Sequence, residues 1–167
     1  MSLDGYIASN EGDLSFLSIV EQEDLDYGYS EFIKTVDTVI IGRKTYDKVI
    51  SMGYDYATSS KDVFVITRTE KPDEGNRKFY SGDLADLVSN LKSVEGKNIY
   101  CDGGAEIVNA LLSQNLIDEF IISIIPILLG NGIALFKNSL SKQKLTLISS
   151  EQFSTGLVQL RYTLFKN

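Results

Sequence analysis

Apolar residues follow two spacings along the chain, and the two spacings alternate. Short continuous runs of apolar residues predict buried strands at 38–42, 63–67, 78–80 and 98–101, and a longer strand at 117–125. Apolar residues that recur every three or four positions predict helices at 22–35 and 43–51, then at 84–91 behind the capping residue Asp83, and from Ile107 to Leu112. Strands that alternate with helices favour an α/β fold with a largely parallel central sheet.

The two ends of the chain depart from this alternation. Residues 2–16 combine glycines with polar residues and are predicted to form a loop. Residues 144–152 and 156–165 predict an antiparallel hairpin whose turn lies at 154–156. The sequence has no linker-like stretch, internal repeat or low-complexity segment, so we expect a single domain spanning residues 1–167.

Charge is spread unevenly over the sequence. The formal net charge of −7 disfavours non-specific nucleic-acid binding. Eight carboxylates and no cation precede Lys34, whereas residues 43–78 hold eight of the 16 Lys and Arg. An acidic protein with one basic segment suggests a small anionic ligand, although cations clustered on a solvated face would give the same pattern.

Composition excludes several kinds of chemistry. The chain contains no histidine, which removes Ser-His-Asp and Cys-His nucleophiles and any metal site with His ligands. The single cysteine, Cys101, cannot form an intramolecular disulfide or a thiolate zinc site, and it fits a reducing cytoplasm. The longest apolar run, 120–129, is broken by Ser123 and Pro126, so no membrane span is expected. Acid–base work is left to carboxylates, Tyr, Lys or water.

The most informative motif joins a predicted strand to a predicted helix at Gly42-Arg43-Lys44-Thr45. Glycine permits a tight exit from the strand, and the first turn of a helix presents free N–H groups and a positive dipole end that suit a phosphate. Arg43 and Lys44 add full charges, and Arg can bind a phosphate through two parallel hydrogen bonds. This chemistry suits the extra phosphate of NADPH, and it also fits an ordinary strand–helix junction with solvated cations.

A second junction of this type is Asp102-Gly103-Gly104-Ala105-Glu106. Its two glycines allow a ligand to approach the backbone, but it lacks the G-x-G-x-x-G spacing of the usual dinucleotide fingerprint. Ligands of open α/β sheets bind at the carboxyl ends of the strands, so both junctions are expected at one edge of the sheet. Thr67 and Arg68 end a third strand and place another hydroxyl and cation at that edge, either for an adenosine 2′-phosphate or as an ordinary polar loop.

These pieces, in this order, resemble the dihydrofolate reductase superfamily, and in particular the C-terminal reductase domain of the bifunctional riboflavin-biosynthesis deaminase/reductase. The residues that carry the resemblance are Ser2-Leu3-Asp4-Gly5-Tyr6-Ile7-Ala8, Gly42-Arg43-Lys44-Thr45-Tyr46, Asp102-Gly103-Gly104-Ala105-Glu106, Leu116-Ile117-Asp118-Glu119 and Pro126-Ile127-Leu128-Leu129-Gly130-Asn131-Gly132. The resemblance covers nearly the whole chain. It implies a dihydrofolate-reductase-like, three-layer α/β fold that ends in an antiparallel hairpin, and a homodimer built through the late strands.

The resemblance also implies that NADPH lies across the strand ends. By this analogy Arg43, Lys44 and Thr45, after Gly42, take the 2′-phosphate and pyrophosphate end. Thr67 and Arg68 flank the adenosine, the segment Gly103, Gly104, Ala105 and Glu106 holds the pyrophosphate, and Ile7 and Ala8 border the nicotinamide. A further strand precedes the Ser2–Ala8 segment in relatives. Because the sequence starts at Met1, that strand is expected to be missing from these residues.

One carboxylate on the first helix of dihydrofolate reductases binds the pterin and helps to deliver a proton. Counting back from the Gly-Arg-x-Thr motif places Asp26 at that position, with Asp24 and Glu31 as rivals, and a solvated helix carboxylate as the plain alternative. The implied activity is hydride transfer from NADPH to a small pteridine or pyrimidine. Two acceptors compete: dihydrofolate, and the ribosylaminopyrimidine of riboflavin synthesis, whose phosphate could meet Lys34.

Two functions of other classes stay open from the sequence. A non-catalytic NADPH sensor on the same scaffold would bind the dinucleotide without turning over any substrate. A pure interaction module would not bind a nucleotide at all.

Overall fold

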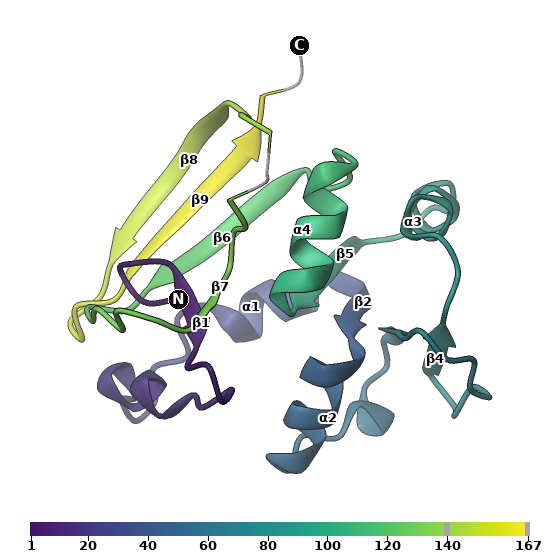
Figure 1. Cartoon of the computed structure of the whole chain (residues 1–167), viewed down its shortest axis with the longest axis horizontal. Coiled ribbons are helices and arrows are strands. Elements are labelled where there is room, and N and C mark those ends of the chain that lie inside the picture. The colour runs from purple at the N-terminus through teal and green to yellow at the C-terminus, as the bar shows by residue number, and fades with distance from the viewer. Residues whose placement is uncertain (139–140, 166–167) are drawn as a thin grey trace. The chain divides into compact units, whose positions relative to one another are not determined.

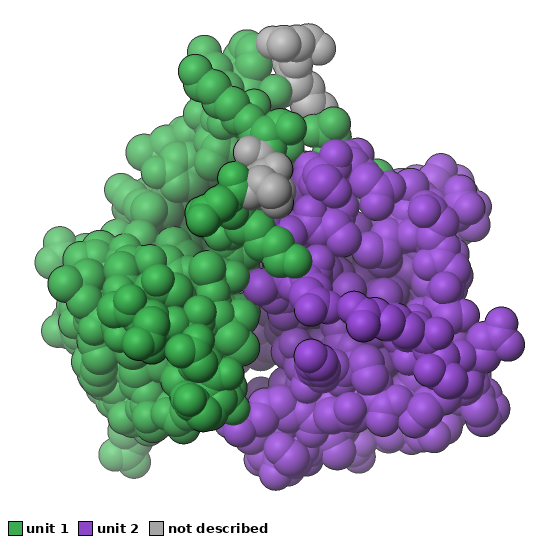
Figure 2. Space-filling model, viewed as in Figure 1, with its two compact units in different colours: residues 1–27, 115–167 green, residues 28–114 purple. Residues whose placement is uncertain are grey.

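The structure is a computed structural model that describes residues 1–138 and 141–165. Its internal contacts divide the chain into two compact units (Figure 2). We call residues 28–114 the parallel-sheet unit, and residues 1–27 with 115–167 the antiparallel unit. Among the described residues, every helix is too short or too polar to span a bilayer.

The parallel-sheet unit is built on one four-stranded sheet with the order β4-β3-β2-β5, and all neighbouring strands in it are parallel. The strands are β2 (Val36–Gly42), β3 (Asp62–Ile66), β4 (Arg77–Tyr80) and β5 (Asn98–Gly103). The helices are α1 (Tyr29–Lys34), α2 (Arg43–Ser51), α3 (Leu84–Lys92) and α4 (Ala105–Ser113), with a 3-10 turn η2 (Tyr56–Thr58) (Figure 1).

Strand β2 forms the centre of this unit because both of its faces are buried. Successive side chains of a strand point to opposite faces. Ile40 and Ile41 are 1% and 0% exposed, so both faces of the sheet are covered at this strand. The core cluster around Ile41 includes Val63 and Val65 of β3, and Phe32 of α1 packs against it. The α/β fold and the parallel sheet expected from the sequence are confirmed.

The antiparallel unit contains two smaller sheets. Strand β1 (Tyr6–Ala8) pairs with β7 (Ile133–Ala134), and η1 (Ser15–Val20) is a 3-10 helix. Strands β6 (Glu119–Ile124), β9 (Val158–Leu164) and β8 (Leu145–Gln152) lie side by side in that order (Figure 1). The hairpin of β8 and β9 is antiparallel as expected, and β6 joins it as the third strand.

The turn-like segment at the start of the chain is held by its carboxylate. Asp4 accepts hydrogen bonds from the N–H groups of Leu129 (3.1 Å) and Gly130 (2.7 Å) and from Ser2 Oγ (2.7 Å). These bonds, led by the one from Ser2, lower the pKa of Asp4. Asp4 therefore joins the 126–132 segment to the amino-terminal segment.

Two expectations about the amino-terminal region are wrong. Residues 2–16 are not only loop, because β1 pairs with β7, a partner more than a hundred residues away that local spacing does not reveal. The helix predicted at 22–35 begins only at Tyr29. Asp24, Tyr27 and Gly28 have positive φ angles of 61°, 56° and 78°, which a right-handed helix excludes. Tyr27 instead packs edge-on against Phe153, with 4.9 Å between ring centroids.

Candidate functional site

The two glycine junctions touch each other at the carboxyl end of the parallel sheet. Strands β2 and β5 are parallel neighbours, and Ile41 pairs with Gly103. A Cβ atom added to Gly104 would lie 2.7 Å from Thr45 Oγ1, and one added to Gly42 would lie 2.9 Å from Ile107 Cγ1. Contacts this short mean that a Cβ atom at Gly42 or Gly104 would force the neighbouring side chain to shift. The prediction that both junctions share one edge of the sheet is confirmed.

The helices that leave these junctions begin without side-chain caps. Neither Gly42 before α2 nor Gly104 before α4 provides a capping hydrogen bond. By contrast α3, which begins after β4, is capped by Asp83, whose Oδ1 accepts from Ala85 N at 2.7 Å and from Asp86 N at 3.2 Å. Uncapped first-turn N–H groups are available to an anion, so the two adjacent starts form a backbone cradle suited to a pyrophosphate. Gly103 has a φ of +97°, and its peptide bond to Gly104 is cis.

Arg43 is oriented by its neighbours on α2 and β4. Its Nε donates to Asp47 Oδ1 at 2.7 Å and Oδ2 at 2.8 Å, and its Cζ lies 5.9 Å from the ring centroid of Phe79. The side chain keeps 33% of its surface exposed, and its two terminal nitrogens have no hydrogen-bond partner in the part of the chain that is described. The two terminal nitrogens are therefore accessible to an anion, while the Nε edge of the guanidinium is fixed by Asp47. Lys44, the next residue, is exposed.

The structure also brings the end of β3 toward the first turn of α4. Arg68 Nη2 lies 3.7 Å from Glu106 Oε2, and the two side chains are 94% and 66% exposed. An ion pair so exposed is weak, so both groups can turn toward a ligand. The N–H of Thr67 donates a hydrogen bond to Tyr80 O at 2.9 Å, which joins the end of β3 to β4. Ala105, the first residue of α4, is buried.

Three of the residues selected from the sequence belong to the antiparallel unit. Ile7 and Ala8 lie on β1, and Ala8 is buried while Ile7 is partly exposed. Asp26 lies in an exposed loop, not on a helix as the counting assumed. Of its rivals, Asp24 is an exposed turn residue and Glu31 forms an exposed ion pair with Lys34.

A carboxylate that the sequence reasoning passed over is Asp102, the last residue before the double glycine. Tyr56 Oη donates to its Oδ2 at 2.6 Å and Tyr100 Oη donates to its Oδ1 at 2.8 Å. Burial raises the pKa of Asp102, and the two hydrogen bonds oppose this rise only in part. Burial, the charge of Asp102 and the bonds to it also raise the pKa values of Tyr56 and Tyr100. The sequence contained one indication of this contact. Tyr100 and Asp102 are two positions apart, a spacing that places both side chains on one face of β5.

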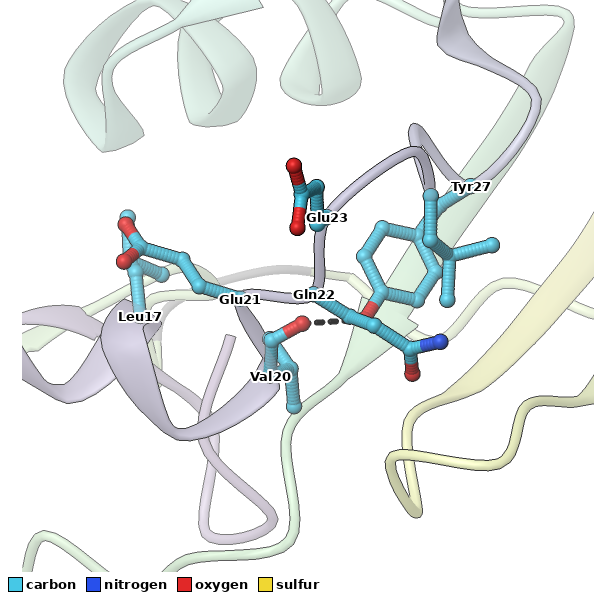
Figure 3. A pocket seen from close by; sticks show the side chains of 7 residues that line it. Leu17, Val20, Glu21, Gln22, Glu23 and Tyr27 are labelled. Carbon is cyan, nitrogen blue, oxygen red and sulfur yellow. Dashed lines mark hydrogen bonds between the residues drawn. The ribbon is translucent and has the colours of Figure 1, made fainter.

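A separate hollow of about 500 Å³ lies within the antiparallel unit (Figure 3). It is lined by one segment: Leu17, Val20, Glu21, Gln22, Glu23, Leu25 and Tyr27. Tyr27 Oη donates a hydrogen bond to Val20 O beside this hollow, and it lies 3.0 Å from Thr155 Oγ1. The hollow contains none of the residues selected for the cofactor.

Comparison with known proteins identifies the family and supports the fold described above. Residues 1–159 match the RibD C-terminal domain family over nearly the whole chain. The chain belongs to this family. YwjB from Bacillus subtilis (strain 168) is 42% identical to it over 164 residues, which cover 97% of this chain and 92% of YwjB.

Solved structures extend the comparison. A Shewanella sp. PV-4 protein named for riboflavin biosynthesis superposes with a TM-score of 0.89 and 34% identity, covering 99% of this chain and 96% of that one. Dihydrofolate reductase from Enterococcus faecalis, solved in complex with NADP(H), shares the fold with a TM-score of 0.68 and 17% identity, covering 99% and 93%. This RibD C-terminal domain therefore has a dihydrofolate-reductase-like fold, and its family indicates a reductase.

Proposed function

We propose that this chain is an NADPH-dependent reductase that transfers a hydride to a small pteridine or pyrimidine. One observation carries the proposal: two uncapped helix starts lie in contact at one edge of a parallel sheet, and each follows a glycine whose added Cβ atom would collide with a neighbouring side chain. A dinucleotide has two adjacent phosphates that such a cradle suits. Membership of the RibD C-terminal domain family supports a reductase of the riboflavin-pyrimidine reductase kind.

The resemblance to the dihydrofolate reductase superfamily assigns a group of residues to each part of NADPH. Gly103, Gly104, Ala105 and Glu106 would hold the pyrophosphate through backbone N–H groups. Arg43, Lys44 and Thr45 would hold the 2′-phosphate end, with Thr67 and Arg68 beside the adenosine. For Ile7 and Ala8, which belong to the antiparallel unit, the contact with the nicotinamide is assigned by the resemblance alone. When bound, NADPH supplies the hydride, and the protein's task is to align the acceptor, exclude water and provide a proton.

Because the chain has no histidine, the proton must come from a carboxyl group, Tyr, Lys or water. Asp26 is the candidate chosen by analogy with dihydrofolate reductase, and replacing it by Asn tests that role. If Asp26 is the proton source, Asp26→Asn should lower kcat by on the order of 10²–10⁴. An unchanged kcat would exclude it.

The acceptor decides between two activities. Membership of the RibD C-terminal domain family favours reduction of 5-amino-6-(5-phosphoribosylamino)uracil, and the shared fold is also that of dihydrofolate reductase. Lys34, the cation that the sequence suggested for a substrate phosphate, forms an exposed ion pair with Glu31. Because an exposed ion pair is weak, Lys34 could leave Glu31 and bind a substrate phosphate. The turnover assay below decides between the two acceptors.

The experiment combines a binding readout with a turnover readout. NADPH is expected to raise the melting temperature, since a ligand at about 100 times its Kd stabilises a protein by about 2.7 kcal/mol. NADPH oxidation, followed by absorbance, is then measured with dihydrofolate and with the phosphoribosylaminouracil. Binding without turnover of either would indicate the non-catalytic sensor, and no thermal shift would contradict the proposed function altogether. The single cysteine fits the cytoplasm as the place of this reaction.

We also propose that the protein is a homodimer formed through the three-stranded sheet of the antiparallel unit. Strand β8 lies at the edge of this sheet, and its Leu145, Leu147 and Ile148 are 42%, 52% and 54% exposed. An edge strand with exposed apolar residues favours pairing with another chain. Light scattering is expected to give twice the mass of one chain, and Leu147→Lys is expected to shift the protein toward monomer. A wild-type mass equal to one chain would contradict the dimer.

A further inference from the structure

The first turn of α4 differs in charge from the first turn of α2. Arg43 and Lys44 open α2, and no carboxylate lies in its first turn. Glu106 is the acidic residue in the first turn of α4, directly after the Gly104-Ala105 start. The two helix starts that touch at one edge of the sheet therefore carry opposite charges. An additional phosphate is favoured beside α2 and opposed by the carboxylate of Glu106.

The side chain of Glu106 also extends beyond its own helix. Its Oε2 lies 3.7 Å from Nη2 of Arg68, which follows the end of β3. In the sheet order β4-β3-β2-β5, the strands β3 and β5 lie on either side of β2, whose last residue Gly42 pairs with Ile66 of β3. The ion pair therefore joins the carboxyl ends of two strands that are not neighbours, beside the two glycine junctions.

This ion pair can be exchanged for a ligand at little cost. The side chains of Arg68 and Glu106 are 94% and 66% exposed, so solvent screens their attraction. Neither side chain has another ion-pair or hydrogen-bond partner within residues 1–138 and 141–165. A ligand that offers hydroxyl groups to Glu106, or a phosphate to Arg68, can therefore replace the pair.

The course of the Glu106 side chain matches one part of a dinucleotide. In the proposed binding mode, the backbone of Glu106 belongs to the pyrophosphate cradle and Arg68 lies beside the adenosine. The adenosine ribose is the part of the dinucleotide that connects these two regions. A carboxylate that starts at the cradle and ends at Arg68 is therefore within reach of the ribose hydroxyls.

A carboxylate and a guanidinium are the two groups that distinguish NADH from NADPH. In dinucleotide sites, an acidic side chain accepts a hydrogen bond from the ribose 2′-hydroxyl of NADH, whereas an arginine accommodates the 2′-phosphate of NADPH. This chain places one group of each kind at the same point, paired with each other. Either group can bind its own dinucleotide while the other turns toward solvent.

We propose, on the basis of the reductase function above, that this chain binds NADH as well as NADPH and that Glu106 holds the ribose hydroxyls of NADH. Arg68 turns to the 2′-phosphate when NADPH binds. The two dinucleotides carry the same dihydronicotinamide. With either one, the acceptor gains one hydride from the dinucleotide and one proton from solvent by way of the acid, and the oxidised dinucleotide is released.

The experiment measures the Kd of NADH and of NADPH by fluorescence titration of the wild type and two variants. Glu106→Gln keeps the length of the side chain and removes its charge. It is expected to weaken NADH binding by about tenfold, because hydrogen bonds to a charged group are lost. The same variant is expected to tighten NADPH binding, because the repulsion of the 2′-phosphate disappears. Arg68→Gln is expected to weaken the binding of NADPH and not that of NADH.

Asp62→Asn is the matched control for these variants. Asp62 begins β3, at the opposite end of the strand from Arg68, and it is an exposed carboxylate that pairs with Lys78. Its substitution removes one charge from the same strand without touching the glycine junctions. Both Kd values should therefore stay constant.

Turnover gives a second readout for the role of Glu106. The wild type is expected to oxidise NADH with the same acceptor that it reduces with NADPH. Because Glu106 contacts the adenosine end and not the reacting atoms, Glu106→Gln should raise the KM for NADH and leave kcat unchanged. A lower kcat at constant KM would place Glu106 elsewhere in the reaction and would overturn the assignment.

The opposite signs expected for the two dinucleotides separate this role from a structural one. If Glu106 only stabilised the start of α4, Glu106→Gln would change the Kd of NADH and of NADPH in the same direction, and this result would overturn the proposal. A wild type that binds NADPH but not NADH would overturn it as well. A wild type that binds neither dinucleotide would contradict the proposed function itself rather than the role of Glu106.

Discussion

Replacing Gly132 by Ala is expected to destabilise the antiparallel unit severely. Gly132 has a φ of +148°, and an added Cβ atom would lie 2.2 Å from the carbonyl oxygen of Ala8. That oxygen belongs to the backbone of β1, so it cannot turn away as a flexible side chain would. Backbone strain and overpacking together should cost about 2–4 kcal/mol in the free energy of unfolding. Chemical denaturation of the purified variant measures this loss directly.

Gly130→Ala is the matched control two positions earlier. Gly130 also has a positive φ, 75°, but no atom lies within 4 Å of its added Cβ. Gly130→Ala should lower the free energy of unfolding by only about 1–2 kcal/mol, which is the cost of a left-handed backbone conformation for a residue with a side chain. Equal losses for the two variants would show that the contact with Ala8 does not govern stability. A larger loss for Gly132→Ala would locate the constraint at the pairing of β1 with β7.

Arg43→Ala is expected to weaken NADPH binding much more than NADH binding. The guanidinium of Arg43 is fixed through Nε by Asp47 and lies over Phe79, so its terminal nitrogens are oriented before a ligand arrives. Loss of charged hydrogen bonds to the 2′-phosphate should cost about 1.5–3 kcal/mol, or a factor of about 10–150 in Kd. NADH has no 2′-phosphate, so its affinity should change little. Titration of both dinucleotides by fluorescence measures the two changes.

Arg161→Ala serves as the control for this variant. Arg161 lies on β9 in the antiparallel unit, where it forms two hydrogen bonds with Glu119. Removing it takes away the same charge without touching the glycine junctions, so the Kd of NADPH should stay constant. If Arg43→Ala weakened NADPH and NADH equally, Arg43 could not be the ligand of the 2′-phosphate.

Most helices and strands of the parallel-sheet unit could be predicted because local signals specify them. The segment that became β2 contains the continuous apolar run Val39-Ile40-Ile41, which is typical of a strand buried on both faces. Asp83 caps α3 as its side chain and position indicated. The helix expected at 22–35 failed because the contact of Tyr27 with Phe153 and the positive φ angles before Tyr29 outweigh helical spacing. No local pattern could reveal a partner so far along the chain.

Part of the candidate site could likewise be predicted from local signals, and part could not. The glycine junctions could be found because glycine and charge mark them directly in the sequence. Asp102 was recognised only as part of the second glycine junction. Nothing in the sequence shows that the hydroxyl of Tyr56, 46 residues away, would donate a hydrogen bond to its carboxyl group. The orientation of Arg43 by Phe79 is equally a product of the β3–β4 arrangement, which brings β4 within reach of α2.

The sequence alone determined the α/β alternation, the glycine turns and the absence of histidine and disulfide chemistry, because each follows from residue type and short spacing. The tertiary structure decided which turns touch, where β1 pairs and which carboxyl group is buried among hydroxyls. Those properties depend on contacts between residues far apart in the chain. Such contacts exist only after the strands have taken their neighbours in the sheet.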